Sequence, residues 1–313
     1  MSRAFTFPGQ GSQAVGMGQA LAEASATARA VFEEVDDALG QHLTKLMAEG
    51  PEDELTLTEN AQPALMAVSL AVMRVLEQDG GISLKDKAIF VAGHSLGEYS
   101  ALAAAGSISL ADTARVLKRR GQAMQRAVPV GEGAMAAVLG LDLDDARAAA
   151  EEAAQGDVCT AANDNAPGQV VLSGSRAAVE RAVVIAKEKG AKRSMLLPVS
   201  APFHCALMAP AADEMADALG AIDIKSPTVP LVANVTAEAV SDPDTIRDLL
   251  VKQVTGAVRW RESVGYMADQ GVTEVVEVGA GKVLTGMAKR INRELTGISI
   301  QTPDDIDDFL KNV

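Results

Sequence analysis

One serine stands between two glycines at the point where a short apolar run meets an alanine-rich helical pattern. In Gly93-His94-Ser95-Leu96-Gly97, the two glycines permit a tight strand-to-helix turn that would lift the serine hydroxyl above a sheet. The N-terminal amides of the following helix would point at the same place and stabilise negative charge on a substrate oxygen. The pattern predicts a nucleophilic serine, and the alternative is a glycine-rich turn with a capping serine.

A nucleophilic serine needs a base, and the chain has three histidines. His94 is adjacent to Ser95, and neighbouring side chains diverge on a sharp turn. His42 lies in a helical stretch that mixes charged and apolar residues, which favours a position on the surface. His204 lies in a proline-containing segment that could fold over a site, so elimination predicts it as general base and later general acid. The alternative is a histidine with a purely structural role.

The group that would orient the imidazole is left open by the sequence pattern. The aspartates of the small domain predicted below lie between Ser95 and His204, and none of them is indicated by its spacing: Asp142, Asp144, Asp145, Asp157 and Asp164. A main-chain carbonyl or an amide side chain could take the place of the carboxylate.

Short β-rich runs alternate with helical stretches along most of the chain, which predicts an α/β fold with a parallel central sheet. The two glycines and the serine then stand on a turn like that of α/β-hydrolases. The predicted strands of this sheet are 4–7, 88–93, 229–234 and 274–279. The predicted helices before the small domain are 14–48, 61–79, 96–105 and 110–127.

The segment 133–199 follows a different order, strand-helix-strand-strand-helix-strand, which is that of a ferredoxin-like module. Its strands are predicted at 134–140, 157–162, 168–174 and 191–199, with helices at about 142–155 and 175–190. We therefore expect a small ferredoxin-like domain at 129–198, inserted into a large α/β-hydrolase-like domain made of 1–128 and 199–313.

Composition narrows the functional classes. Hydrophobic residues make up 48% and charged residues 22% of the 313 residues, as in a soluble globular protein, and no apolar run reaches the roughly 18 residues of a membrane helix. A net charge of −14 with 3% aromatic residues disfavours nucleic-acid binding. The two cysteines, Cys159 and Cys205, form no disulfide framework, which favours the cytoplasm. No Cys/His spacing predicts a metal site.

Six segments in order carry a resemblance over essentially the whole chain: FPGQGSQ at 7–13, GHSLGEYSALAAAG at 93–106, RGQAMQ at 120–125, NDNAPGQVVLSG at 163–174, VSAPFHC at 199–205 and EVGAGKVLTG at 277–286. The chain resembles the malonyl-CoA:acyl carrier protein transacylases, the acyltransferases of type II fatty acid synthesis. The resemblance implies transfer of a malonyl group from malonyl-CoA to the phosphopantetheine thiol of holo acyl carrier protein, through a malonyl-serine.

The resemblance also implies roles for individual residues. Ser95 would carry the acyl group and His204 would be its base, oriented by the main-chain carbonyl of Gln253. Gln10 and the Leu96 amide would form the oxyanion hole. Three residues would shape the substrate pocket, with Arg120 gripping the malonyl carboxylate: Arg120, Asn165 and Phe203.

A guanidinium at position 120 makes physical sense as the specificity element. It can hold a carboxylate through two parallel hydrogen bonds. An acyl group without a carboxylate would leave that arginine unpaired, at a cost of roughly 2–5 kcal/mol. A simple esterase would have no use for this residue. Arg119, the neighbouring arginine, is expected on the surface.

The acceptor implied by the resemblance is acidic, as is this chain, so docking would need a local basic patch. The candidates are Lys118, Arg119, Lys192, Arg193, Lys289 and Arg290. We expect a monomer that uses no cofactor. The alternatives are a serine hydrolase or thioesterase with the same turn, a discrete polyketide-type acyltransferase, and a non-catalytic interaction module.

Overall fold

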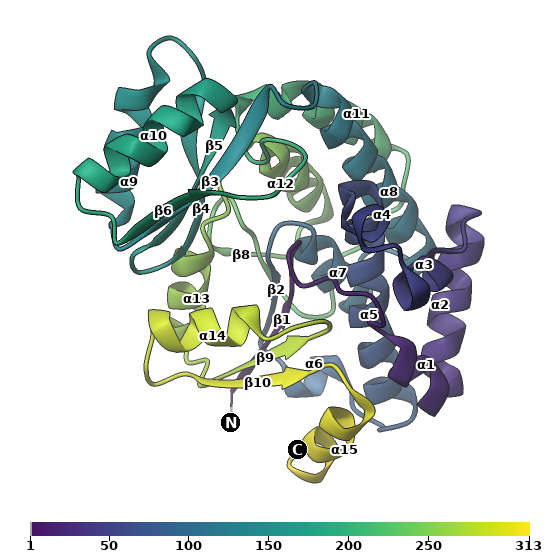
Figure 1. Cartoon of the computed structure of the whole chain (residues 1–313). Coiled ribbons are helices and arrows are strands. Elements are labelled where there is room, and N and C mark those ends of the chain that lie inside the picture. Colours follow the sequence, from purple (N-terminus) through teal and green to yellow (C-terminus); the bar gives the residue numbers. More distant parts are fainter. Residues whose placement is uncertain (1) are drawn as a thin grey trace.

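The computed structural model describes residues 2–313, and its larger sheet brings together strands from both ends of the chain (Figure 1). The strand order is β10-β9-β1-β2-β7-β8; all neighbours run parallel except β8, which is antiparallel to β7. The strands are β1 (Arg3–Phe7), β2 (Phe90–Gly93), β7 (Leu231–Val232), β8 (Ala239–Val240), β9 (Glu274–Val278) and β10 (Thr296–Ile300).

Both faces of this sheet are covered, which explains why its central strands are nearly continuous apolar runs. Phe5 and Phe7 of β1 point into a core formed with helices that include α5 and α8, whereas Ala4 points into a second core with α13 and α14. All five residues of β1 and all five of β9 are buried. Charged or polar residues on either face would therefore lose their hydration, and the few that occur need internal partners.

The helices around the larger sheet pack on both of its faces and at its edges (Figure 1). Those before the small unit are α1 (Gln19–Ala24), α2 (Ala26–Leu39), α3 (Leu43–Glu49), α4 (Glu52–Thr56), α5 (Thr58–Gln78), α6 (Leu84–Lys87), α7 (Gly97–Ala104) and α8 (Leu110–Ala127). Those after it are a short 3₁₀ helix (Ala206–Met208), α11 (Ala209–Gly220), α12 (Pro243–Thr255), α13 (Trp260–Asp269), α14 (Val283–Ile291) and α15 (Pro303–Lys311).

The predicted helical stretch 14–48 is three helices rather than one. Residues 14–18 form turns, and the left-handed Gly18 precedes α1. Extended Ser25 separates α1 from α2 and caps α2, because its hydroxyl accepts a hydrogen bond from the Ala28 N–H. Gly40 ends α2 at φ 57°, a conformation that glycine adopts without steric cost. By contrast, α8 spans the same residues, 110–127, that the sequence pattern predicts.

The second sheet comes from residues 133–196 and has the order β4-β5-β3-β6, with every neighbouring pair antiparallel. Its elements are β3 (Gly133–Leu139), α9 (Leu143–Ala154), β4 (Cys159–Ala166), β5 (Gln169–Ser175), α10 (Arg176–Glu188) and β6 (Arg193–Leu196). We call these elements the small unit. The α/β fold with a ferredoxin-like βαββαβ insertion is confirmed. Strand β4 is longer than predicted, because residues 163–166 continue it past a bulge.

The two faces of the sheet in the small unit are buried in two different hydrophobic cores. On one face, α9 and α10 pack on Val138 and Leu172 to form a core of its own. On the other face, Met135 and Val171 join the core of the larger sheet. The same strands therefore serve as a self-supporting layer and as one wall of the space between the two sheets.

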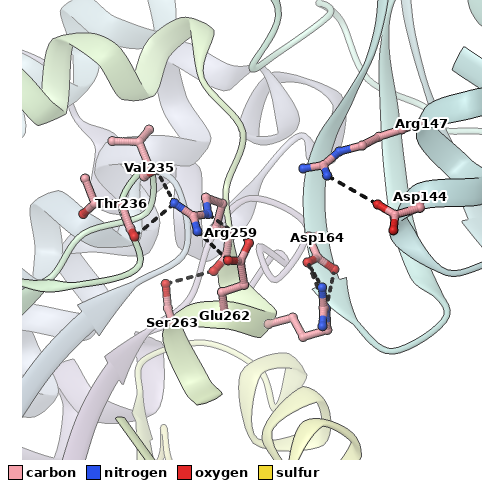
Figure 2. A network of polar contacts seen from close by, with 9 residues as sticks. Asp144, Arg147, Asp164, Val235, Thr236, Arg259, Glu262 and Ser263 are labelled. Atoms are coloured by element: carbon pink, nitrogen blue, oxygen red, sulfur yellow. Dashed lines mark hydrogen bonds and ion pairs between the residues drawn. The ribbon is translucent and has the colours of Figure 1, made fainter. Parts of the chain in front are cut away.

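Strand β4 is also bonded directly to the main body of the protein. The Val258 N–H donates to the Ala162 carbonyl over 2.8 Å, and the Asp164 N–H donates to the Val258 carbonyl over 3.0 Å. Beside this bridge, Arg261 of α13 holds the buried Asp164 carboxylate through Nε and Nη2 at 2.8 to 3.0 Å. Figure 2 shows Asp164 in this contact, with the more exposed Asp144–Arg147 pair nearby.

Removing the Arg261 side of this ion pair should destabilise the protein. In Arg261→Gln, the Asp164 carboxylate, whose side chain is 4% exposed, would lose its cation. Because Arg261 itself is partly exposed, we expect a loss of about 1–2 kcal/mol in the free energy of unfolding, measured by urea titration. Arg147→Gln is the matched control, since its partner Asp144 is 94% exposed and the pair should contribute nothing measurable. Equal effects of the two substitutions would contradict this assignment.

Candidate active site

The turn between β2 and α7 places Ser95 at the carboxyl edge of the parallel sheet. Ser95 has φ 55°, in the left-handed region that non-glycine residues rarely adopt. A Cβ at Gly93 would lie 1.9 Å from the Gly97 carbonyl carbon, and a Cβ at Gly97 would lie 2.2 Å from the Phe7 oxygen. Neither position can hold a side chain, so both glycines are needed for the backbone to make this turn.

His204 meets Ser95 from the segment that follows the small unit. Its Nε2 lies 2.7 Å from Ser95 Oγ, and its Nδ1 lies 2.8 Å from the Gln253 main-chain oxygen and 3.1 Å from that of Gly256. Carbonyl oxygens only accept hydrogen bonds, so Nδ1 carries the proton and Nε2 accepts from the serine hydroxyl. Burial, with the nearby Arg120 charge, lowers the pKa of His204 to about 3, so the imidazole is neutral at physiological pH.

Arg120 reaches the same point from α8, and its side chain is almost completely buried. Its Nη1 donates to Gln62 Oε1 over 2.8 Å, and its Nη2 donates to Gln253 Oε1 over 2.8 Å and to Ser95 Oγ over 3.1 Å. These acceptors are all neutral. The guanidinium is therefore a buried positive charge beside the serine hydroxyl, and its hydrogen bonds within residues 2–313 leave it without a contacting carboxylate. Arg119, by contrast, pairs with Glu214 near the surface.

Gln10 and Leu96 line the same cavity as Ser95. Leu96 is the residue before α7, and within residues 2–313 its main-chain N–H donates to no other main-chain oxygen. Gln10 is held from α5, where the Thr58 hydroxyl donates to its Oε1 over 2.9 Å. A main-chain N–H at a helix start and a primary amide are both groups that can stabilise an oxyanion.

These groups line a cavity of about 600 Å³ between the two sheets. All predicted site residues except Gln253 line it, and Gln253 lies directly behind His204 and Arg120. Phe203 is buried in the wall. Asn165 Oδ1 of β4 accepts a hydrogen bond from His94 Nε2 over 2.8 Å. His94 points toward Asn165 and the Trp260 ring, 5.7 Å between ring centroids, and so diverges from Ser95 as predicted.

Four polar contributions were not predicted from the sequence. They are the side chains of Gln62, Glu98 and Asn234 and the side-chain amide of Gln253, which are all at most 1% exposed. Asn234 Oδ1 accepts from the Ser95 N–H over 2.8 Å, and its Nδ2 donates to the Gly93 carbonyl over 2.7 Å. The only sequence signal is a polar residue within an apolar stretch, as at Gln62 in NAQPALMAV, and that signal does not name a partner.

Other residues considered for chemistry have ordinary surroundings. His42 is exposed at the start of α3. Cys159 and Cys205 are buried free thiols, and burial raises the pKa of both. Among residues 2–313, no three His, Cys, Asp or Glu side chains gather as metal ligands would. Over the same range, none of the helices combines the length and apolar character needed to span a membrane.

Comparison with known proteins relates this geometry to one family. The Acyl transferase domain family matches residues 4–302. A malonyl CoA-acyl carrier protein transacylase of Escherichia coli (strain K12) is 51% identical over 300 residues, 96% of each chain. The crystal structure of an acyl-carrier-protein-S-malonyltransferase from Bartonella henselae is 56% identical, with a TM-score of 0.97 over 100% of this chain and 99% of that one.

A further solved structure contains a type II PKS acyl-carrier protein in complex with its malonyl-transacylase. That transacylase is 43% identical to this chain, with a TM-score of 0.96, and each chain is covered completely. The matches span the larger sheet and the small unit together. The chain therefore belongs to the Acyl transferase domain family.

Proposed function

We propose that this protein is an [acyl-carrier-protein] S-malonyltransferase, which moves the malonyl group of malonyl-CoA to the phosphopantetheine thiol of holo acyl carrier protein. The observation that carries the proposal is a buried arginine, Arg120, 3.1 Å from a serine hydroxyl that also contacts a neutral histidine. The serine and histidine can carry out acyl transfer, and the buried arginine can bind the carboxylate of a carboxylated acyl group. The names of the relatives support the same activity.

In the first half-reaction, Ser95 Oγ attacks the thioester carbon of malonyl-CoA and gives its proton to His204 Nε2. The negative charge that develops on the thioester oxygen is stabilised by the Leu96 N–H and by Gln10. The carbon–sulfur bond then breaks, and His204 returns the proton to the departing CoA sulfur. In the second half-reaction, the phosphopantetheine thiol gives its proton to His204 and attacks the malonyl ester carbon. The bond between that carbon and Ser95 Oγ breaks, and His204 returns the proton to Oγ, which restores Ser95.

The Gln253 and Gly256 carbonyls take the place of a triad carboxylate. Both lie within 3.1 Å of His204 Nδ1 and hold the tautomer whose Nε2 can accept the serine proton. Asn165 and Phe203 shape the cavity beside them. The reaction as written needs no redox cofactor, because no atom changes its oxidation state. It needs no metal, because His204 activates the nucleophile and hydrogen bonds stabilise the oxyanion.

We extend the proposal to the organisation of the chain and its setting. Residues 1–128 and 199–313 form the large domain and 129–198 the small ferredoxin-like domain. The protein works as a monomer in the cytoplasm, without binding nucleic acid or membrane. The net charge of −14 disfavours nucleic acid as a partner, and the free thiols Cys159 and Cys205 are typical of cytoplasmic proteins. A serine hydrolase would have no use for the buried Arg120, and a non-catalytic module would have no use for the Ser95–His204 contact.

Covalent loading of Ser95 is the first expected outcome. Mixed with malonyl-CoA, the protein should gain one malonyl adduct by intact-protein mass spectrometry, and holo acyl carrier protein should discharge it. The adduct should be absent in Ser95→Ala, which lacks the nucleophile, and present in Ser226→Ala, a substitution at an exposed loop serine. Release of free malonate without an adduct would favour a hydrolase, and neither product would favour a non-catalytic module.

Replacing Arg120 should remove the preference for malonyl over acetyl groups. In Arg120→Ala, the carboxylate loses its charged partner, and the ratio of the kcat/KM values for the two acyl-CoA substrates should fall by about thirty-fold or more. Arg119→Ala is the matched control, because Arg119 pairs with Glu214 away from the cavity. A ratio unchanged in Arg120→Ala would remove the carboxylate clamp from the proposal.

The basic residues proposed for the carrier-protein surface differ in their ion pairs and exposure. Lys118 and Arg119 already form ion pairs with Glu59 and Glu214. Lys289 and Arg290 are exposed at the end of α14, whose earlier residues Val283, Leu284 and Met287 line the cavity. We therefore place the acidic partner against α14 and include Lys192 and Arg193 as a second, more distant contact.

Charge reversal on α14 should separate the two half-reactions. Lys289→Glu with Arg290→Glu should slow transfer from malonyl-Ser95 to holo carrier protein at least ten-fold, because like charges then meet across the interface. Loading of Ser95 by malonyl-CoA should stay within two-fold of the unmodified rate. The control, Lys45→Glu with Lys311→Glu, reverses two exposed charges on α3 and α15, away from α14 (Figure 1). Equal loss of both half-reactions would argue against docking on α14.

A further inference from the structure

Glu98 carries a carboxylate that none of the steps above uses. It lies in the first turn of α7, three residues after Ser95, and is completely buried. Its Oε2 accepts hydrogen bonds from Gln253 Nε2 over 2.8 Å and from the Asn234 N–H over 3.1 Å. Its Oε1 is buried without a hydrogen-bond partner among the described residues. A buried carboxylate bonded only to neutral groups is costly to the fold, so its presence calls for an explanation.

The explanation begins with the polarity of the Gln253 amide, which has a donor end and an acceptor end. Its Nε2 faces two close acceptors, Glu98 Oε2 at 2.8 Å and the Ser95 carbonyl at 2.9 Å. Its Oε1 faces Arg120 Nη2, a donor. The reversed amide would set oxygen against oxygen at one end and N–H against N–H at the other, so Glu98 helps to fix the orientation in which Gln253 can hold Arg120.

Gln253 is also the residue whose main-chain carbonyl faces His204 Nδ1. One residue thus contacts the arginine through its side chain and the histidine through its backbone. The second partner of Glu98, Asn234, accepts from the Ser95 N–H and donates to the Gly93 carbonyl on the other side of the turn. The Glu98 carboxylate therefore supports two residues that between them touch Arg120, His204 and Ser95.

We propose that Glu98 is a positioning residue that acts through the Gln253 amide to set Arg120 in the orientation that recognises the malonyl carboxylate. The inference rests on the proposed function. The Glu98 charge polarises the amide and strengthens its acceptor end, which keeps Arg120 Nη2 anchored at the cavity that Arg120 lines. Glu98 does not contact the substrate, and its effect is on discrimination between acyl groups.

Loss of the Glu98 charge should therefore affect the stability of the fold and the selectivity between acyl groups differently. Burial raises the pKa of Glu98 to about 7, which the hydrogen bonds from Gln253 and Asn234 and the nearby Arg120 charge only partly offset. A carboxyl whose pKa is higher in the folded than in the unfolded chain is most favourable to folding below its unfolded value, and that contribution is lost as the pH rises through about 7. At pH 8, replacing the ionised group by a neutral side chain of the same shape should leave the fold equally or more stable.

The test is Glu98→Gln, measured at pH 8 by the rates of Ser95 loading with malonyl-CoA and with acetyl-CoA and by thermal unfolding. We expect at least a ten-fold fall in the malonyl-over-acetyl ratio, mainly through a higher KM for malonyl-CoA, with a Tm that is not lowered. In an Arg120→Ala background, Glu98→Gln should cause no further fall in the ratio, because the two residues act in series.

Glu277→Gln is the matched control. Glu277 of β9 is also fully buried, one of its carboxylate oxygens accepts from Thr285, and the other has no partner among the described residues. The same chemical change there should leave the malonyl-over-acetyl ratio within two-fold. Glu98→Met, which offers an apolar side chain of similar length, is the second variant in case Glu98→Gln fails to fold, and it should lower the ratio equally.

Three outcomes would overturn the inference while leaving the proposed function intact. They are an unchanged ratio in a folded Glu98 variant, an equal loss of rate with both acyl-CoA substrates, and a further fall of the ratio in the Arg120→Ala background. Absence of a malonyl adduct on Ser95 in the unmodified protein would instead overturn the proposed function, and this inference with it.

Discussion

The closeness of the Ser95 turn to strand β1 is the constraint on which the site depends. The His94 N–H donates to the Phe7 carbonyl over 3.0 Å, and a single methyl group at Gly97 would collide with that same carbonyl. Because the backbone passes so near, α7 starts directly over the carboxyl edge of the sheet, and the Leu96 N–H next to the serine donates to no main-chain oxygen among residues 2–313. Every other functional group then has to reach this fixed point from an element that packs above or beside it.

Those groups converge from separate elements through buried polar contacts. Arg120 comes from α8, Gln253 from α12 and Asn234 from the segment just after β7, and all are at most 1% exposed. In a low-dielectric interior, hydrogen bonds of this kind are strong when complete and costly when broken, so the elements hold one another in register. The arrangement therefore specifies both the positions of the side chains and the packing of the helices that carry them.

Much of the fold and of the candidate site could be predicted from the sequence, because the informative features were local. Two glycines around Ser95 require a turn, three histidines leave few choices for a base, and helix 110–127 has one uninterrupted amphipathic pattern. The prediction of one helical stretch over 14–48 was wrong. The apolar spacing continues across Gly18, Ser25 and Gly40, but the helical backbone is interrupted at these positions. Glu98 and Asn234 could not be paired from the sequence, because 136 residues separate them and periodicity carries no information about contacts at that distance.

The base and the small unit are tied together by one short segment of chain. Gly256 offers its carbonyl to His204 Nδ1, and two residues later Val258 exchanges hydrogen bonds with β4. Strand β4 also brings Asn165 to His94, the neighbour of the serine. A shift of the small unit would thus move a partner of the histidine and a partner of the serine turn at once. Because the cavity lies between the two sheets, this shared attachment keeps its wall and its reactive groups in a single geometry.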